Sequence, residues 1–271
     1  MEAAQDLSPL SLLFCALLML LPLAAVWYFR LGLVKNVLIS SIRMVVQLVL
    51  MGVYLELLFK WNVGWINLLW FLAMMTAAMF SVLKNSQLNA KRLAWPVLAS
   101  FALTNLFILL YFNGLVVRLD SLFDAKYIIA IGGMILGNSL RGNVIGLGDF
   151  YQSIAKEEHL YTYKLGLGAS SYEALLPFAK QSFKAAIMPG IASMATMGIV
   201  SVPGMMTGQL LGGSVPMTAI KYQIAIMVAI LTSTVIGIAL SLIFTTRIAF
   251  DRNGMLRKDI LHSNSSQNYH R

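Results

Sequence analysis

The sequence predicts an all-α protein that crosses a membrane about seven times. Of its 271 residues, 59% are hydrophobic and only 11% are charged, whereas soluble domains contain about 25% charged residues. The apolar residues gather in runs of about 20, the length that a helix needs to cross about 30 Å of hydrocarbon. No stretch shows the short alternating segments of a membrane β-barrel, so helices are the remaining way to satisfy the backbone in lipid.

The apolar runs can be placed in order along the chain. The first follows Glu2 and Asp6 rather than the basic residues of a cleavable signal peptide, so we expect it to remain as a membrane helix. We expect one membrane domain over 1–247 and a basic, then polar tail over 248–271 that is disordered at its end. Helices are expected over 10–29, 37–58, 63–83, 94–116, 126–147, 186–211 and 222–246.

The net charge of +9 is distributed in a way that predicts orientation. If the N-terminus lies outside, fifteen Lys and Arg residues fall in the inner segments and four in the outer segments. The positive-inside rule therefore favours an outer N-terminus and an inner C-terminus. Because topology and anionic lipid explain the basic residues, we expect no nucleic-acid partner. The only cysteine is Cys15, which excludes a disulfide framework within one chain.

Residues 148–185 are more polar than their surroundings and lie on the inner side in this topology. Ser170 precedes Glu173 by three residues, which is the pattern of a capping box at a helix start. A short amphipathic helix is expected to follow and to reach Lys184. Two interpretations remain open at this point: an interfacial helix resting on lipid, or a docking helix for another protein.

Polar residues inside apolar runs are costly and each requires a reason. Arg43 and Gln47 are four residues apart and share one face of the second predicted helix. They are expected to face the bundle interior, although Arg43 could instead extend to the inner headgroups. In the fifth predicted helix, Asn138 and Arg141 accompany glycines spaced by four, which favour close helix packing. The sequence therefore predicts that this helix lies inside the bundle.

The sixth predicted helix contains Pro203 near its middle. A proline there frees a backbone carbonyl and kinks the helix, and broken helices often mark the substrate path of a transporter. The alternative is a kink in a tightly packed helix. Thioether sulfur binds soft metals, yet methionine more often fills irregular gaps, so a methionine metal site is a weaker expectation. The residues considered for these roles are Met194, Met197, Met205, Met206, Thr207 and Gln209.

No catalytic constellation is expected in this chain. Two of its three histidines, His262 and His270, lie in the tail, and no pair of carboxylates is placed for acid–base work. The phosphate-binding pattern G-x-x-x-x-G-K-[ST] does not occur, so we expect no nucleotide hydrolysis by the chain itself. The chain also lacks an evident carboxylate cage for a hard cation.

Several short stretches together resemble a known family. They read SIRMVVQL over 41–48, GMILGN over 133–138, LGA over 167–169, VSVPGMMTG over 200–208 and AIKYQI over 219–224. These stretches resemble the small ABC transporter permease family that includes the bacterial iron exporter FetB and the plant aluminium-sensitivity permeases. The likeness covers nearly all of the predicted helices.

The resemblance implies the permease subunit of an ATP-driven exporter in the plasma (cell inner) membrane. ATP and Mg would bind a separate ATP-binding subunit, this chain would need no cofactor, and two permease chains would form a homodimer along the glycine faces of the fifth and sixth helices. The cargo would be iron, another metal or a metal-linked solute, with a nucleotide sugar as the alternative. An ATPase-independent transporter or channel, and a membrane-anchored scaffold, are the competing interpretations.

The resemblance also changes the interpretation of 148–185 in favour of docking to the ATP-binding subunit, although the Glu-Ala-Ala start of importer coupling helices is missing. The docking residues that it implies are Gly168, Ala169, Ser170, Glu173 and Phe178. The expected translocation pathway comprises Arg43, Gln47, Asn138, Arg141, Pro203, Met205, Met206, Thr207 and Gln209.

Overall fold

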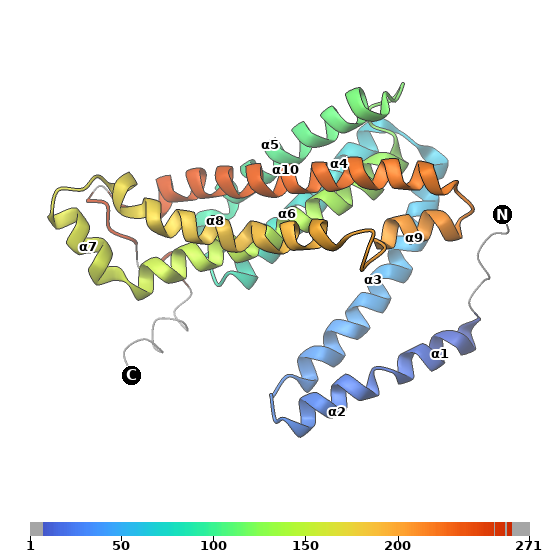
Figure 1. Ribbon diagram of the computed structural model, residues 1–271, viewed down its shortest axis with the longest axis horizontal. Coiled ribbons are helices and arrows are strands. Elements are labelled where there is room, and N and C mark those ends of the chain that lie inside the picture. The colour runs from blue at the N-terminus through green and yellow to red at the C-terminus, as the bar shows by residue number, and fades with distance from the viewer. Residues whose placement is uncertain (1–7, 252, 258, 262–271) are drawn as a thin grey trace.

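The computed structural model describes residues 8–251, 253–257 and 259–261, and this part of the chain contains helices and no strand. Figure 1 shows long helices packed side by side into one bundle, from which the first helices lean away. The elements are α1 (Pro9–Leu17), α2 (Leu20–Tyr28), α3 (Val34–Trp61), α4 (Gly64–Asn85), α5 (Ala90–Tyr111), η1 (Phe112–Val117), α6 (Ala125–Lys156), α7 (Glu158–Gly166), α8 (Ser171–Thr196), α9 (Gly204–Leu211) and α10 (Pro216–Ala249).

The predicted class, an all-α multi-pass membrane protein, is confirmed. Within the described residues, six helical segments are long and apolar enough to cross a membrane. They are Leu10–Tyr28, Val34–Trp61, Gly64–Asn85, Ala90–Val117, Ala125–Lys156 and Pro216–Ala249.

The predicted helix over 186–211 is divided between the end of α8 and the whole of α9. Helical structure stops after Thr196, and Gly198 adopts a φ of +83° that a side chain would disfavour. Pro203 then precedes α9 with extended backbone angles instead of kinking a continuous helix. The proline therefore begins a new helix, consistent with its preference for helix starts.

The bundle consists of α4, α5, α6, α8 and α10, which bury most of the apolar core between them. Phe71, Phe101 and Ile238 are fully buried within it. Close packing depends on small residues at the crossing points. A Cβ atom at Gly142 would lie 2.5 Å from Thr234 Cγ2 on α10, so only glycine allows this approach of α6 to α10.

The first three helices form an arm that contrasts with the bundle (Figure 1). None of the described side chains of α1 or α2 is buried, and α3 buries only Leu58 near its C-terminal end. The apolar surface of the arm, including Trp27, Leu48 and Leu50, is available to lipid. In a bilayer such exposure is favourable because lipid is as apolar as these side chains.

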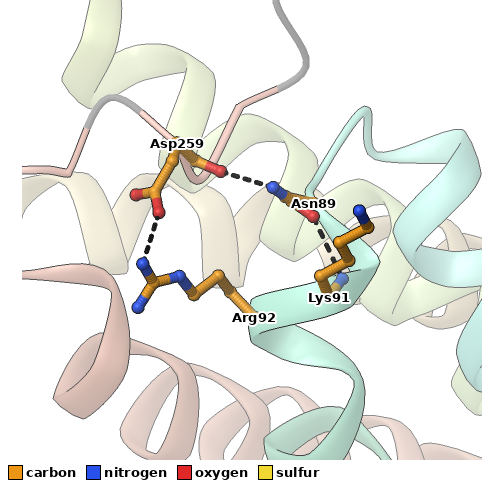
Figure 2. A network of polar contacts seen from close by, with 4 residues as sticks. All are labelled: Asn89, Lys91, Arg92 and Asp259. Atoms are coloured by element: carbon orange, nitrogen blue, oxygen red, sulfur yellow. Dashed lines mark hydrogen bonds and ion pairs between the residues drawn. The ribbon is translucent and has the colours of Figure 1, made fainter.

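The end of the bundle far from the α3–α4 turn is formed by α7, the turn between α4 and α5, and residues 249–251, 253–257 and 259–261. We call it the basic end. The Asp259 carboxylate forms an ion pair with the Arg92 guanidinium, with 2.9 Å between Oδ2 and Nη2. The backbone oxygen of Asp259 accepts a hydrogen bond from Asn89 Nδ2 at 2.8 Å (Figure 2). Ile260 is fully buried nearby. The beginning of the predicted tail is therefore packed, and 262–271, where disorder was expected, lie outside the described residues.

The capping box at the start of α8 is confirmed. Ser170 Oγ accepts from the Glu173 backbone amide, and the Glu173 carboxylate accepts from the Ser170 amide at 2.9 Å. The helix that follows differs from the expectation, because it does not end near Lys184 but continues to Thr196. Pro189 removes one backbone donor without ending the helix, and the predicted amphipathic helix is the first half of a longer one.

Candidate translocation pathway and docking end

Two of the predicted pathway residues, Asn138 and Arg141, line a cavity between α6, α8 and α10, which we call the α8 cavity. Its volume is about 190 Å³. Ser193 and Met194 contribute from α8, and Thr234 from α10. Asn138 Nδ2 donates to the Met134 carbonyl at 2.8 Å, and Arg141 is exposed.

Two other predicted residues, Met205 and Gln209, line a second cavity of about 270 Å³ formed by α6, α9 and α10, which we call the α9 cavity. Its other polar lining residues are Lys126, Tyr127, Ser214, Thr218 and Tyr222, and the two tyrosine hydroxyls lie 3.4 Å apart. Gln209 Oε1 is buried and has no hydrogen-bond partner among the described residues. The α9 cavity therefore offers a free acceptor, tyrosine hydroxyls and one cation.

An apolar cluster lies between the two cavities along both α6 and α10. On α6, the α9 cavity is lined from within 126–131 and the α8 cavity from within 138–145, with Ile135 of the cluster between them. On α10, Ile226 of the cluster follows Tyr222 of the α9 cavity and precedes Ile230 of the α8 cavity. Along both helices the two cavities are therefore separated by apolar side chains of this cluster.

A buried polar seam joins α5, α6 and α10 and was missed by the sequence reasoning. Ser100 and Ser241 hydroxyls lie 2.6 Å apart, and Ser233 Oγ lies 3.2 Å from Asn105 Oδ1. Their spacing was a usable signal, because Ser233, Gly237, Ser241 and Thr245 recur every four residues on α10. The buried atoms Thr104 Oγ1, Ser139 Oγ and Asn143 Oδ1 in this seam have no partner among the described residues.

The break between α8 and α9 is anchored to α10 by a glutamine. Gln223 is 6% exposed, and its Nε2 donates to Met197 Sδ at 3.8 Å. Met194 lines the α8 cavity, so the two weaker metal candidates have different surroundings. Among the described residues, no group of three His, Cys, Asp or Glu side chains could hold a metal ion.

The remaining pathway candidates do not line either cavity. Thr207 is exposed and donates to the Pro203 carbonyl at 3.2 Å within α9, and Met206 is half-buried. Arg43 and Gln47 are exposed on α3 in the arm. The structure thus places candidates from α6 and α8 in the α8 cavity and candidates from α9 in the α9 cavity. The pair on α3 lines neither cavity, because α3 diverges from the bundle.

Four of the five predicted docking residues lie at the turn between α7 and α8: Gly168, Ala169, Ser170 and Glu173. Gly168 has a φ of +91°, which favours glycine and closes the end of α7. Hydrogen bonds from Ser170 lower the pKa of the exposed Glu173 carboxyl below its ordinary value. Phe178 is different: it is 5% exposed, packs in the core and lies beneath the Lys164 ammonium, so its ring cannot face a partner.

Other side chains at the same turn are exposed instead. Leu167 is 71% exposed and Tyr172 is 74% exposed, on either side of Gly168. Tyr163 on α7 is 65% exposed. These three side chains, which we call the turn patch, were missed because the helix boundaries that expose them were not predicted.

Comparison with known proteins adds independent findings. Residues 9–250 match the family described as "Uncharacterised protein family (UPF0014)". The chain is 27% identical to the UPF0014 membrane protein YjkA of Bacillus subtilis, covering 85% of this chain and 91% of that protein. It is 29% identical to the probable iron export permease protein FetB of Escherichia coli, covering 80% and 83%.

A plant relative is also similar: the chain is 30% identical to the protein ALUMINUM SENSITIVE 3 of Arabidopsis thaliana, covering 73% of this chain and 71% of that protein. No solved structure matches the chain. The family match spans every described helix, and the helices themselves are those of a multi-pass membrane protein. The chain therefore belongs to the UPF0014 family of membrane proteins.

Proposed function

We propose that this chain is the membrane-spanning permease subunit of an ATP-driven exporter for iron or another metal or metal-linked solute. The name of the Escherichia coli relative, a probable iron export permease, supports transport and the cargo class. ATP and Mg are assigned to a separate ATP-binding subunit. The membrane is proposed to be the plasma membrane, with the basic end on its inner side because the Lys and Arg excess lies there.

One observation carries this proposal: α8 is a single helix that begins at the exposed α7–α8 turn and ends in the wall of the α8 cavity. Its 26 residues span about 39 Å at the rise of an α-helix. Ser193 and Met194 near its end line the cavity, while Tyr172 at its start belongs to the turn patch. A partner that moves the turn therefore moves the cavity wall with it.

The two cavities support alternating access as the mode of transport. Each is partly open, and the apolar cluster around Ile135 and Ile226 lies between them. A shift of α8 and α9 relative to α6 and α10 would widen one cavity and narrow the other. ATP binding can drive this shift only if the ATP-binding subunit prefers one of the two states.

A homodimer is proposed because two ATP-binding subunits need two docking turns. The glycines differ in whether they could lie in a dimer interface. Gly142 and Gly146 pack against α10 within the chain and are not available, whereas Gly137, Gly204 and Gly208 have open space where a side chain would lie. The dimer interface is therefore proposed along these three open glycines.

The second candidate is a transporter that works without an ATPase, and a nucleotide sugar is the alternative cargo. Proton-coupled transporters use inward-facing acidic side chains as relays. Within the described part of the chain, no carboxylate lines the α8 cavity or the α9 cavity. This observation favours the ATP-driven interpretation over proton coupling.

Co-purification tests the proposal. The tagged full-length chain is extracted from its native membranes, and bound ATP-binding subunits are identified by mass spectrometry. Leu167→Asp places a charge in the turn patch and should abolish recovery of the subunit. Leu167 is 71% exposed, so the change removes little packing within the chain.

Lys91→Asp is the matched control because it places the same charge at an exposed position of the same end, in the first turn of α5. Recovery should remain at the level of the unaltered chain. If no ATP-binding subunit is recovered with the unaltered chain, or if both variants recover it equally, the docking assignment is wrong.

A further inference from the structure

The α8 cavity has an unusual charge for a metal exporter. Its ionisable lining residue is Arg141, and its other polar lining residues are Asn138, Ser193 and Thr234. Arg141 forms no ion pair in the part of the chain that the structure describes, where Arg92 and Asp259 form the one such pair. The cavity therefore presents an unneutralised guanidinium.

The nearest carboxylate along α6 does not neutralise this charge. Asp149 follows Arg141 by eight residues, or about 12 Å along the helix axis. Its Oδ2 accepts a hydrogen bond from Ser182 Oγ at 2.6 Å, which holds it toward the middle of α8. The α9 cavity repeats the pattern, because Lys126 is its ionisable cation and no carboxylate of the described residues lines it.

A bare divalent cation is poorly matched to such a cavity. Iron and similar ions are bound by imidazole, thiolate or carboxylate groups, and the cavity offers two thioethers, at Met194 and Met227, with neutral oxygens and a cation. Coulomb repulsion from Arg141 would add to the cost of removing water from the ion.

An anionic group is well matched to the same residues. A guanidinium donates paired hydrogen bonds to carboxylate or phosphate oxygens. Ser193 Oγ lies in the same lining and can donate a further hydrogen bond. Arg141 is exposed, but the cavity that it lines has walls from three packed helices. These walls partly shield the interaction from screening by bulk ions.

We propose that the α8 cavity binds the negatively charged group of an anionic solute through Arg141, so that any metal moved by this chain travels as an anionic chelate rather than as a bare cation. This inference rests on the proposed function as a permease and specifies its substrate class. Two sources share the required chemistry, a carboxylate chelate of a metal and a phosphate-bearing solute.

Equilibrium binding to the full-length chain in lipid nanodiscs tests this proposal without an ATP-binding subunit. The probes are radiolabelled Fe²⁺ kept reduced, ferric citrate and pyrophosphate. At least one of the two anions should bind saturably, and Fe²⁺ should not. Binding of ferric citrate alone assigns the chelate, and binding of pyrophosphate alone assigns a phosphate-bearing solute.

Variants connect binding to the cavity. Arg141→Gln should weaken anion binding by about tenfold or more, as expected for loss of one charged partner, and Arg141→Lys should weaken it less. Lys84→Gln removes an exposed cation outside the cavity, in the last turn of α4, and should have no effect. Gly190→Leu fills the cavity from α8 at a glycine with open space around it, and should weaken binding while all charges remain.

Saturable binding of Fe²⁺ that survives Arg141→Gln would overturn the proposal, as would anion binding that all cavity variants leave unchanged, or no anion binding at all. None of these results bears on whether an ATP-binding subunit docks at the α7–α8 turn. Conversely, loss of docking would leave the binding result intact, so the two failures are distinguishable.

Discussion

The bundle and the arm are built from equally apolar sequences but are stabilised differently. The apolar window of α3 has a mean hydropathy of 1.9 with 0% of it buried, and that of α4 has the same mean hydropathy with 39% buried. The bundle helices contact one another through fully buried side chains such as Phe71. The arm helices lean away from the bundle (Figure 1), and of their described residues only the C-terminal part of α3, around Tyr54 and Leu58, packs against it.

This difference teaches that hydropathy identifies the membrane-crossing helices but not their neighbours. In lipid, association between helices depends on packing, small residues and polar contacts rather than on hydrophobicity. The bundle has such features, including Gly142 and the seam around Ser100 and Ser241. The described part of the arm has few, so its stability within the chain should respond weakly to substitution.

The largest expected contrast comes from truncating one apolar side chain in each region. Phe71→Ala removes a fully buried ring of the bundle and should cost about 3–5 kcal/mol of unfolding free energy. Leu48→Ala removes a side chain that is 60% exposed on the arm and should cost less than about 1 kcal/mol. Equilibrium unfolding in mixed detergent micelles measures both, and equal costs would remove the distinction.

Adding a methyl group at a glycine should change the unfolding free energy less, and in opposite directions in the two regions. Gly142→Ala forces a Cβ to 2.5 Å from Thr234 Cγ2 and should destabilise the bundle by about 1–3 kcal/mol. Gly52→Ala meets nothing within 4 Å on α3 and should be neutral or stabilising by about 0.5–1 kcal/mol. The same unfolding assay applies, and a destabilising Gly52→Ala would indicate that the arm is packed.

A third pair of substitutions, at Gly166 and Gly168, tests whether the α7–α8 turn is held in one conformation. Gly166 and Gly168 both have open space around them, but only Gly168 has a positive φ, of +91°. Gly168→Ala should therefore cost about 1–2 kcal/mol, and Gly166→Ala should cost nothing. Limited proteolysis at this turn reports the effect locally, and equal cleavage of the two variants would mean that the turn is not held in this conformation.

The smallest effect concerns acidity at the start of α8. The pKa of Glu173 is lowered in the folded chain by hydrogen bonds from the Ser170 side chain and amide. Its contribution to stability is therefore present above the unfolded-state pKa and lost as the pH falls through the folded-state pKa. The protection factors of the amides in the first turn of α8, which correct for the intrinsic slowing of exchange in acid, should fall on acidification, and Glu173→Gln should remove that fall. Unchanged protection factors in the unaltered chain would contradict the capping role.

Much of the fold could be predicted from the sequence because lipid imposes length and polarity on each helix. The capping box at Ser170 was predictable because it depends on residues three apart. The end of α8 was not, because Pro189 and Pro203 look alike in sequence and yet one lies within a helix and the other before one. Only tertiary packing decides between these outcomes.

The candidate site was predicted in part for the same reason. Asn138 and Arg141 line a cavity because they lie on α6 of the bundle, and Met205 and Gln209 line another because α9 packs against α10. Arg43 and Gln47 shared a helix face, which spacing reveals, but spacing does not reveal that α3 leaves the bundle. The seam on α5, α6 and α10 was missed because its members are distant in sequence and each alone is a common helical residue.

The central claim is that α8 transmits movement from the docking turn to the cavity wall, and cysteine accessibility tests it most directly. Ser193→Cys is introduced in a Cys15→Ser background, and labelling by a membrane-impermeant maleimide is followed in the complex with its ATP-binding subunit. The labelling rate at position 193 should change when nucleotide binds, and Leu167→Asp should abolish that change. A rate that is the same with and without nucleotide, in a complex whose subunit is bound, would contradict the account.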